Sequence, residues 1–137
     1  DDRGRTLLIR RAKSPNFGMC STIGGKLDTH TGESPLQCAR REIEEEVEIS
    51  PHCHMQLQYR CILNDDSDAV GSVHLGVVFL LELPAGTDVR VRETEVLEGG
   101  FVSMERLRRE SFEDFESWSR MLLESDFLPY EQFRHEP

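Results

Sequence analysis

The chain has 137 residues, of which 37% are hydrophobic and 31% are charged, and its formal net charge at pH 7 is −10. This length and composition predict a single globular domain over residues 1–137, and no stretch approaches the roughly 20 apolar residues of a membrane span. The excess of 26 acidic over 16 basic residues argues against duplex nucleic acid as the main partner, because proteins that track phosphate backbones present basic surface.

The first elements are expected to be a short apolar strand at 5–11 and a loop at 14–18. A glycine pair at 24–25 then predicts a tight turn whose bare backbone can approach a ligand or a metal. The next element is a helix over roughly 35–47. Its start is well specified, because Ser34 suits the N-cap, Pro35 the first helical position, and Gln37 the third residue of a capping box.

This helix would present three different faces, since residues three or four positions apart lie on one side of a helix. An apolar face would pack on the core and consists of Leu36, Ala39, Ile43 and Val47. A polar face would be solvated and consists of Gln37, Arg40, Glu44 and Glu48. The third face is crowded with like charge and consists of Glu42, Glu45 and Glu46.

The crowded acidic face needs a physical reason, because adjacent carboxylates resist simultaneous ionisation. A divalent cation would turn their repulsion into attraction, and hard carboxylate oxygens suit Mg²⁺ or Mn²⁺. The alternative is a solvated acidic surface without a ligand, which is what most charge runs are.

The rest of the chain predicts further strands and one more helix. Strands are expected at 54–63, 73–83, 89–91 and 100–102, and the nearly continuous apolar run at 73–83 predicts a strand that is buried on both faces. A polar loop at 64–68 and a helical turn at 103–109 would connect them. The final helix would carry an inner stripe made of Phe112, Phe115, Trp118, Met121 and Leu122, which favours core packing over a ligand platform.

The four cysteines, Cys20, Cys38, Cys53 and Cys61, lie without C-x-x-C spacing and favour reduced thiols. The run 52–54, His-Cys-His, offers too few ligands for a zinc site, so a structural role is favoured there over a soft metal. No secretory signal pattern is present. A cytoplasmic location is therefore expected.

The acidic helix and the residues before it resemble the Nudix hydrolase signature, G-x5-E-x7-R-E-U-x-E-E-x-G-U, where U is aliphatic. Glu33 is followed, after seven residues, by R-E-I-E-E-E at 41–46, and Ile49 fills the last aliphatic position. The chain departs from the signature in two places. Its glycine pair lies two residues further from Glu33, so residues 28–31 form a longer loop, and Glu48 replaces a glycine that usually permits a left-handed helix end.

The resemblance implies an α/β fold of the Nudix type, an α/β/α sandwich with a mixed sheet between helices. Family members usually have a strand before the one expected at 5–11, so this single domain is expected either to be whole or to lack that N-terminal strand. The family also often has Trp and Pro shortly before the glycine pair, where this chain has Cys20 and Ile23.

The resemblance also implies Mg²⁺-dependent hydrolysis of the pyrophosphate in a nucleoside diphosphate linked to another group, by water attack at phosphorus. Positioning and charge neutralisation would dominate such a reaction. By correspondence with the signature, the metal would be bound by the Gly25 carbonyl and by the carboxylates of Glu42, Glu45 and Glu46, with Mn²⁺ as an alternative ion. Glu33 would support these ligands or bind a further ion.

The residues expected to carry catalysis are Glu45, Arg41 and Glu95. Arg41, four residues before Glu45, would orient the carboxylates, the alternative being a solvated surface arginine. Family members often recruit a base about six residues before an aromatic that begins the next strand, and Glu95 fits this offset from Phe101 better than Glu93 or Glu98. Each of the three is otherwise an ordinary exposed glutamate.

Arg10, Arg11 and Lys26 are candidates to contact substrate phosphates, although basic residues beside a strand are common without such a role. The expected substrate is a small soluble nucleotide, such as a nucleoside triphosphate, a nucleotide sugar or ADP-ribose, with selectivity in the loops at 28–31 and 64–72. Because many relatives pair, a homodimer is a further expectation. Two rival functions remain open: a catalytically silent Nudix-fold binding module, and an unrelated acidic interaction domain.

Overall fold

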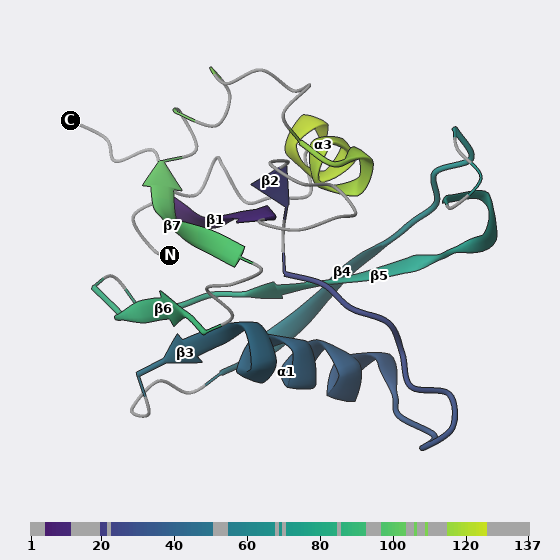
Figure 1. Ribbon diagram of the computed structural model, residues 1–137, viewed down its shortest axis with the longest axis horizontal. Coiled ribbons are helices and arrows are strands. Elements are labelled where there is room, and N and C mark those ends of the chain that lie inside the picture. Colours follow the sequence, from purple (N-terminus) through teal and green to yellow (C-terminus); the bar gives the residue numbers. More distant parts are fainter. Residues whose placement is uncertain are drawn as a thin grey trace.

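A computed structural model describes most of the chain (Figure 1). The described residues are 5–11, 20–21, 23–50, 55–67, 69, 71–84, 86–92, 97–103, 106, 109 and 115–125. The loop expected at 14–18, the run 52–54, Phe112 and most of the turn expected at 103–109 lie outside them.

Helix α1 spans Pro35–Glu46 and starts where its capping residues predict. The Ser34 hydroxyl accepts a hydrogen bond from the Gln37 amide at 3.3 Å, and the Gln37 side chain accepts one from the Ser34 amide at 2.8 Å. This reciprocal pair satisfies two amides that the first turn would otherwise leave without acceptors. The start of the motif helix is therefore fixed locally.

The end of α1 differs from a glycine-terminated helix. Val47 is the C-cap and is extended, with φ −134° and ψ 150°, and its amide donates to the Ile43 carbonyl. The chain passes directly into strand β3, Val47–Ile49, so it never needs the left-handed residue that a glycine would supply. This explains how Glu48 can occupy the glycine position of the signature.

Packing of α1 begins after its first turn. Cys38, Ile43 and Val47 are buried, and Val47 is only 2% exposed. The expectation that Leu36 lies in the core was wrong, because the whole first turn at 34–37 is exposed and Leu36 itself is 39% exposed. The polar face was predicted correctly, since all its members, Gln37, Arg40, Glu44 and Glu48, are exposed.

The described strands form three small antiparallel sheets. The first has the order β2-β1-β7, with β1 Arg5–Arg11, β2 Cys20–Ser21 and β7 Leu97–Ser103. The second pairs β3 with β6, Val89–Val91, and the third pairs β4, Leu57–Leu63, with β5, Gly76–Leu81. Every strand predicted from the sequence is found, β2 and β3 were not predicted, and the pairings among the described strands are all antiparallel.

Strand β5 is less buried than its apolar sequence predicts. Val73 belongs to the 3-10 turn Gly71–Val73 and is 76% exposed, while Leu75, just before the strand, is 62% exposed. Within the strand Val77 is 39% exposed. The residues at 78–81 are half-buried, so the strand is not fully buried as expected. Among the described strands β5 pairs with β4 alone.

One face of the β4–β5 hairpin packs against helix α3, Ser117–Glu124, and α1 lies on the other side of the hairpin (Figure 1). The core there consists of Cys61, Leu63 and Leu122, surrounded by Val78, Trp118 and Met121. The final helix therefore uses its apolar stripe for packing, as predicted, and Phe115 is also buried. None of the described helices is long and apolar enough to cross a lipid bilayer.

Candidate functional site

Arg41 joins the carboxylates of the motif into one network. Its Nε and Nη2 donate to the two oxygens of Glu33 at 3.0 and 3.2 Å, a two-pronged arrangement that favours both strength and orientation. Its Nη1 donates to Glu42 Oε1 at 2.6 Å and to Glu45 Oε2 at 3.1 Å. The arginine therefore binds three carboxylates at once and is not a free surface cation.

Glu33 is held on both sides. Its carboxylate binds Arg41 and also accepts a hydrogen bond from the Asp28 amide at 3.0 Å, and its side chain is only 11% exposed. The hydrogen bonds from Arg41 and then from the Asp28 amide hold the pKa of Glu33 below its ordinary value of 4.5. In turn, Glu33 and then Glu42 raise the pKa of Arg41 further above its usual range. Both groups are charged at neutral pH.

The longer loop before Glu33 folds into a compact turn. The Asp28 carboxylate accepts a hydrogen bond from the His30 amide at 2.9 Å, and the Thr31 hydroxyl donates to the Asp28 carbonyl at 3.2 Å. Gly32 has a φ of 69°, in the left-handed region that glycine adopts without strain. The two extra residues are thus absorbed in a turn, and Glu33 still reaches Arg41.

Gly25 lies directly against the carboxylate of Glu42. A Cβ added at Gly25 would overlap that carboxylate, whereas one at Gly24 would meet nothing within 4 Å. Because the second glycine of the pair has no side chain, the carboxylate of Glu42 can lie directly against the backbone of this loop. The Lys26 carbonyl adds a further tie between this loop and α1, because it accepts a hydrogen bond from Arg41 Nη2 at 3.1 Å.

The three glutamates of the acidic face differ in exposure. The side chain of Glu42 is 14% exposed and that of Glu45 is 52% exposed. Glu46, the last residue of α1, is 5% exposed. The three side chains therefore range from a solvent-exposed carboxylate at Glu45 to a buried one at Glu46, and an ionised carboxylate is costly to bury unless charge or hydrogen bonds compensate.

The donor set, carboxylates of three glutamates on one helix, suits a hard divalent cation by its chemistry. Within the described part of the chain, however, no three His, Cys, Asp or Glu side chains lie close enough together to hold one ion. Glu33, Glu42 and Glu45 converge on the Arg41 guanidinium instead.

Three of the other predicted site residues, Arg10, Arg11 and Lys26, belong to the described part of the chain. Arg10 and Arg11 belong to β1 and are paired through the backbone with Glu98 and Leu97 of β7. Lys26 is exposed and contributes its carbonyl, as described above, to the network. Glu95 and Glu93 lie outside the described residues.

Cys38 is a member of the network that sequence reasoning did not identify. Its buried thiol lies 3.6 Å from Arg41 Nη2, and burial, followed by the charge of Glu33, raises its pKa. The spacing of three residues between Cys38 and Arg41 on one helix was an available signal. The part played by Asp28 depends on the path of the loop, which no spacing in the sequence reveals.

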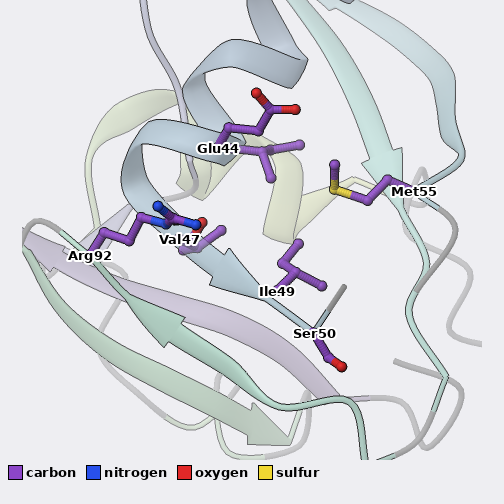
Figure 2. Close-up of a pocket in the computed structure, with 7 residues that line it drawn as sticks. Glu44, Val47, Ile49, Ser50, Met55 and Arg92 are labelled. Carbon is purple, nitrogen blue, oxygen red and sulfur yellow. The ribbon is translucent and has the colours of Figure 1, made fainter. Parts of the chain in front are cut away.

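A small cavity of about 190 Å³ lies beside the end of α1 (Figure 2). Apolar side chains of α1 and β3, Ile43, Val47 and Ile49, line it together with Met55. Figure 2 also shows Arg92, which follows β6, next to Val47. None of the acidic-face glutamates lines this cavity.

Similarity to known proteins agrees with this arrangement. The chain matches the family model of the NUDIX domain over residues 1–124. Protein YmaB of Bacillus subtilis (strain 168) is 31% identical over 85 residues, which cover 61% of this chain and 41% of YmaB. The chain thus spans less than half the length of this relative.

Two solved structures share the fold. A MutT NUDIX hydrolase from Burkholderia pseudomallei is 28% identical and superposes with a TM-score of 0.67, covering 88% of this chain and 87% of that one. The NUDIX domain of Shewanella oneidensis NrtR, solved in complex with ADP ribose, is 20% identical, with a TM-score of 0.64 and coverage of 88% and 73%. The Nudix-type fold class predicted from the sequence is confirmed by these likenesses.

Proposed function

Since the chain belongs to the Nudix hydrolase family, we propose that it hydrolyses the pyrophosphate bond of a small nucleoside diphosphate derivative with the aid of Mg²⁺. The observation that carries this proposal is the network in which Arg41 binds Glu33, Glu42 and Glu45. This network holds three acidic residues of the signature around one arginine, whose positive charge offsets their mutual repulsion.

The residues that would hold Mg²⁺, or Mn²⁺ in its place, are Glu42, Glu45, Glu46 and the Gly25 carbonyl. Arg41 binds one oxygen of Glu42 and one oxygen of Glu45, so that the second oxygen of each carboxylate is available as a ligand. Once bound, the ion would neutralise charge on the pyrophosphate and acidify the attacking water. Glu33 would act through Arg41, because both of its oxygens already bind that guanidinium.

Arg41 would keep the carboxylates from turning apart while their charges are close together. Its guanidinium is planar and remains charged at every working pH, so it fixes the directions of the oxygens that it binds. Glu45, the most exposed of the three glutamates that Arg41 binds, would face the substrate. Glu95 is proposed as the general base that accepts the proton of the attacking water.

The substrate is proposed to be a small nucleotide such as a nucleoside triphosphate, a nucleotide sugar or ADP-ribose. The NrtR domain with bound ADP ribose has the same fold and supports this class, and the net charge of −10 disfavours a long nucleic acid. Arg10, Arg11 and Lys26 are proposed to contact the phosphates, since an acidic protein needs cations or basic groups to bind an anion.

A substrate panel tests the proposal. Nucleoside triphosphates, nucleotide sugars, ADP-ribose and dinucleoside polyphosphates would be incubated with and without Mg²⁺, and phosphate and nucleotide products would be measured. We expect metal-dependent cleavage that Glu46→Gln reduces by at least about 100-fold. Glu44→Gln is the matched control, since it removes the same charge from an exposed position on the same turn. A metal-independent reaction, or equal rates in the two variants, would refute the assignment.

A further inference from the structure

The last turn of α1 concentrates negative charge at the negative end of the helix dipole, which is electrostatically unfavourable. Glu44, Glu45 and Glu46 all lie at the C-terminal end of the helix, where the backbone dipole is negative and carboxylates are destabilised. No basic residue lies in that last turn, and the cation that α1 itself supplies, Arg41, pairs with the side chain of Glu45. The glycine that often satisfies carbonyls at a helix end is also replaced, by Glu48.

Arg92, the residue after β6, supplies a cation and two hydrogen-bond donors at the end of α1. Its amide donates to the Glu46 carbonyl at 2.8 Å, and its side-chain Nε donates to the Val47 carbonyl at 3.1 Å. It directly follows β6, which pairs with β3 and places Val91 opposite Val47. Figure 2 shows its guanidinium beside Val47, at the end of the helix. A cation therefore lies at the negative end of α1, where its guanidinium binds the carbonyl of the C-cap Val47 and its backbone amide binds the carbonyl of Glu46.

We propose that Arg92 is a positioning residue for the metal site: by fixing the last turn of α1, it orients the carboxylates of Glu45 and Glu46 for a divalent cation. This inference rests on the function proposed above and extends it, because Arg92 lies outside the signature. Residues that hold metal ligands in place affect metal affinity without contacting the ion.

The chain offers a matched control for testing Arg92. Arg90 lies two residues earlier in β6, its side chain is 75% exposed, and it pairs with Asp88 at 2.8 Å rather than with the helix. Arg92→Met and Arg90→Met remove the same charge and keep an unbranched apolar stem of similar length. The backbone hydrogen bond from residue 92 to Glu46 survives in Arg92→Met, so the comparison isolates the guanidinium.

The experiment titrates Mg²⁺ against two readouts, the melting temperature without substrate and the hydrolysis rate well below melting. For Arg92→Met we expect about tenfold more Mg²⁺ to be required in both titrations, with the KM for the nucleotide unchanged at saturating Mg²⁺. Arg90→Met should titrate like the wild type. Arg92→Lys should recover part of the loss, because it restores the cation without the Nε donor.

Two results would overturn the inference while leaving the proposed function intact. In the first, Arg92→Met requires the same Mg²⁺ concentration as Arg90→Met. In the second, it melts at a lower temperature but titrates normally, which would make Arg92 a structural residue only. If the wild type itself shows neither Mg²⁺-dependent stabilisation nor hydrolysis, the proposed function fails and this inference fails with it.

Discussion

Arg41 is the residue on which the candidate site depends most directly. A guanidinium has five N–H donors in a rigid fork, and Arg41 directs them to Glu33, Glu42, Glu45 and the Lys26 carbonyl. The spacing of Arg41 and the glutamates was visible in the sequence. Its bond to the Lys26 carbonyl was not, because that bond depends on where the loop at 24–33 passes over the helix. The contact with Cys38 could have been inferred, since the two residues lie three positions apart on α1.

Replacing Arg41 by lysine tests whether the fork matters or only the charge. Lysine is a flexible point charge and cannot bind both oxygens of Glu33 while reaching two other carboxylates. Arg41→Lys should therefore lower kcat/KM by about 10- to 100-fold. Arg40→Lys, the same change at the exposed neighbouring position, should leave kcat/KM unchanged. Equal kinetics for the two variants would mean that Arg41 does not orient the site.

The pKa of Glu33 predicts a pH dependence of stability. Because the pKa of Glu33 is lower in the folded state than its ordinary value of 4.5, the ionised carboxylate stabilises the fold at pH values above 4.5. This stabilisation is lost as the pH falls through the pKa of the folded state. Glu33→Gln should thus be less stable than the wild type at pH 7, and the difference should vanish under strongly acidic conditions. Urea unfolding at several pH values measures it. A difference that is constant with pH would contradict the ion pair.

At the scale of elements, α1 shows what local sequence can and cannot specify. Its start was predictable because Ser34, Pro35 and Gln37 interact within one turn. Its end was not predictable, because the extended conformation of Val47 and the hydrogen bonds from Arg92 depend on the pairing of β3 with β6. In this pairing Glu48 lies opposite Arg90, which is 42 residues later in the sequence. Leu36 was misplaced for a similar reason: helical periodicity gives a direction but not the point at which packing begins.

The contact between the glycine loop and α1 gives a separate prediction. A methyl group at Gly25 would overlap the end of the flexible Glu42 side chain, which can swing away at little cost to stability. Gly25→Ala should hence change the free energy of unfolding by less than about 0.5 kcal/mol, yet weaken Mg²⁺ activation by about tenfold. Gly24→Ala, where the methyl group meets nothing within 4 Å, should do neither. Unchanged Mg²⁺ activation in Gly25→Ala would separate Gly25 from the metal site.

At the scale of the whole molecule, the β4–β5 hairpin is packed by α3 on one face. Sequence patterns identified both strands and the apolar stripe of the helix. They could not predict the exposure of Val73, Leu75 and Val77. An apolar run shows that its residues favour burial, but it does not show which of them other parts of the fold will cover. The aromatic stripe was a better guide, since Trp118 and Leu122 lie in the core as expected.

Gly76 is required where the hairpin meets α3. A Cβ at this position would lie 2.7 Å from the Trp118 ring, which is itself packed against the core around Cys61 and Leu63. Gly76→Ala should destabilise the protein by about 1–3 kcal/mol through overpacking, measured by urea unfolding. Gly100→Ala in β7, where nothing lies within 4 Å, is the comparison. If both variants unfold alike, the hairpin does not pack on α3 as described.

The central claim is that the acidic face of α1 supports metal-dependent attack of water on a phosphorus of a pyrophosphate. The most direct measurement is hydrolysis of ADP-ribose, or of whichever panel substrate is cleaved, in oxygen-18 water with increasing Mg²⁺. We expect the heavy oxygen on phosphorus in one product, at a rate that rises with Mg²⁺ and is largely lost in Glu46→Gln but not in Glu44→Gln. Cleavage without label on phosphorus, or with no need for Mg²⁺ and Glu46, would contradict it.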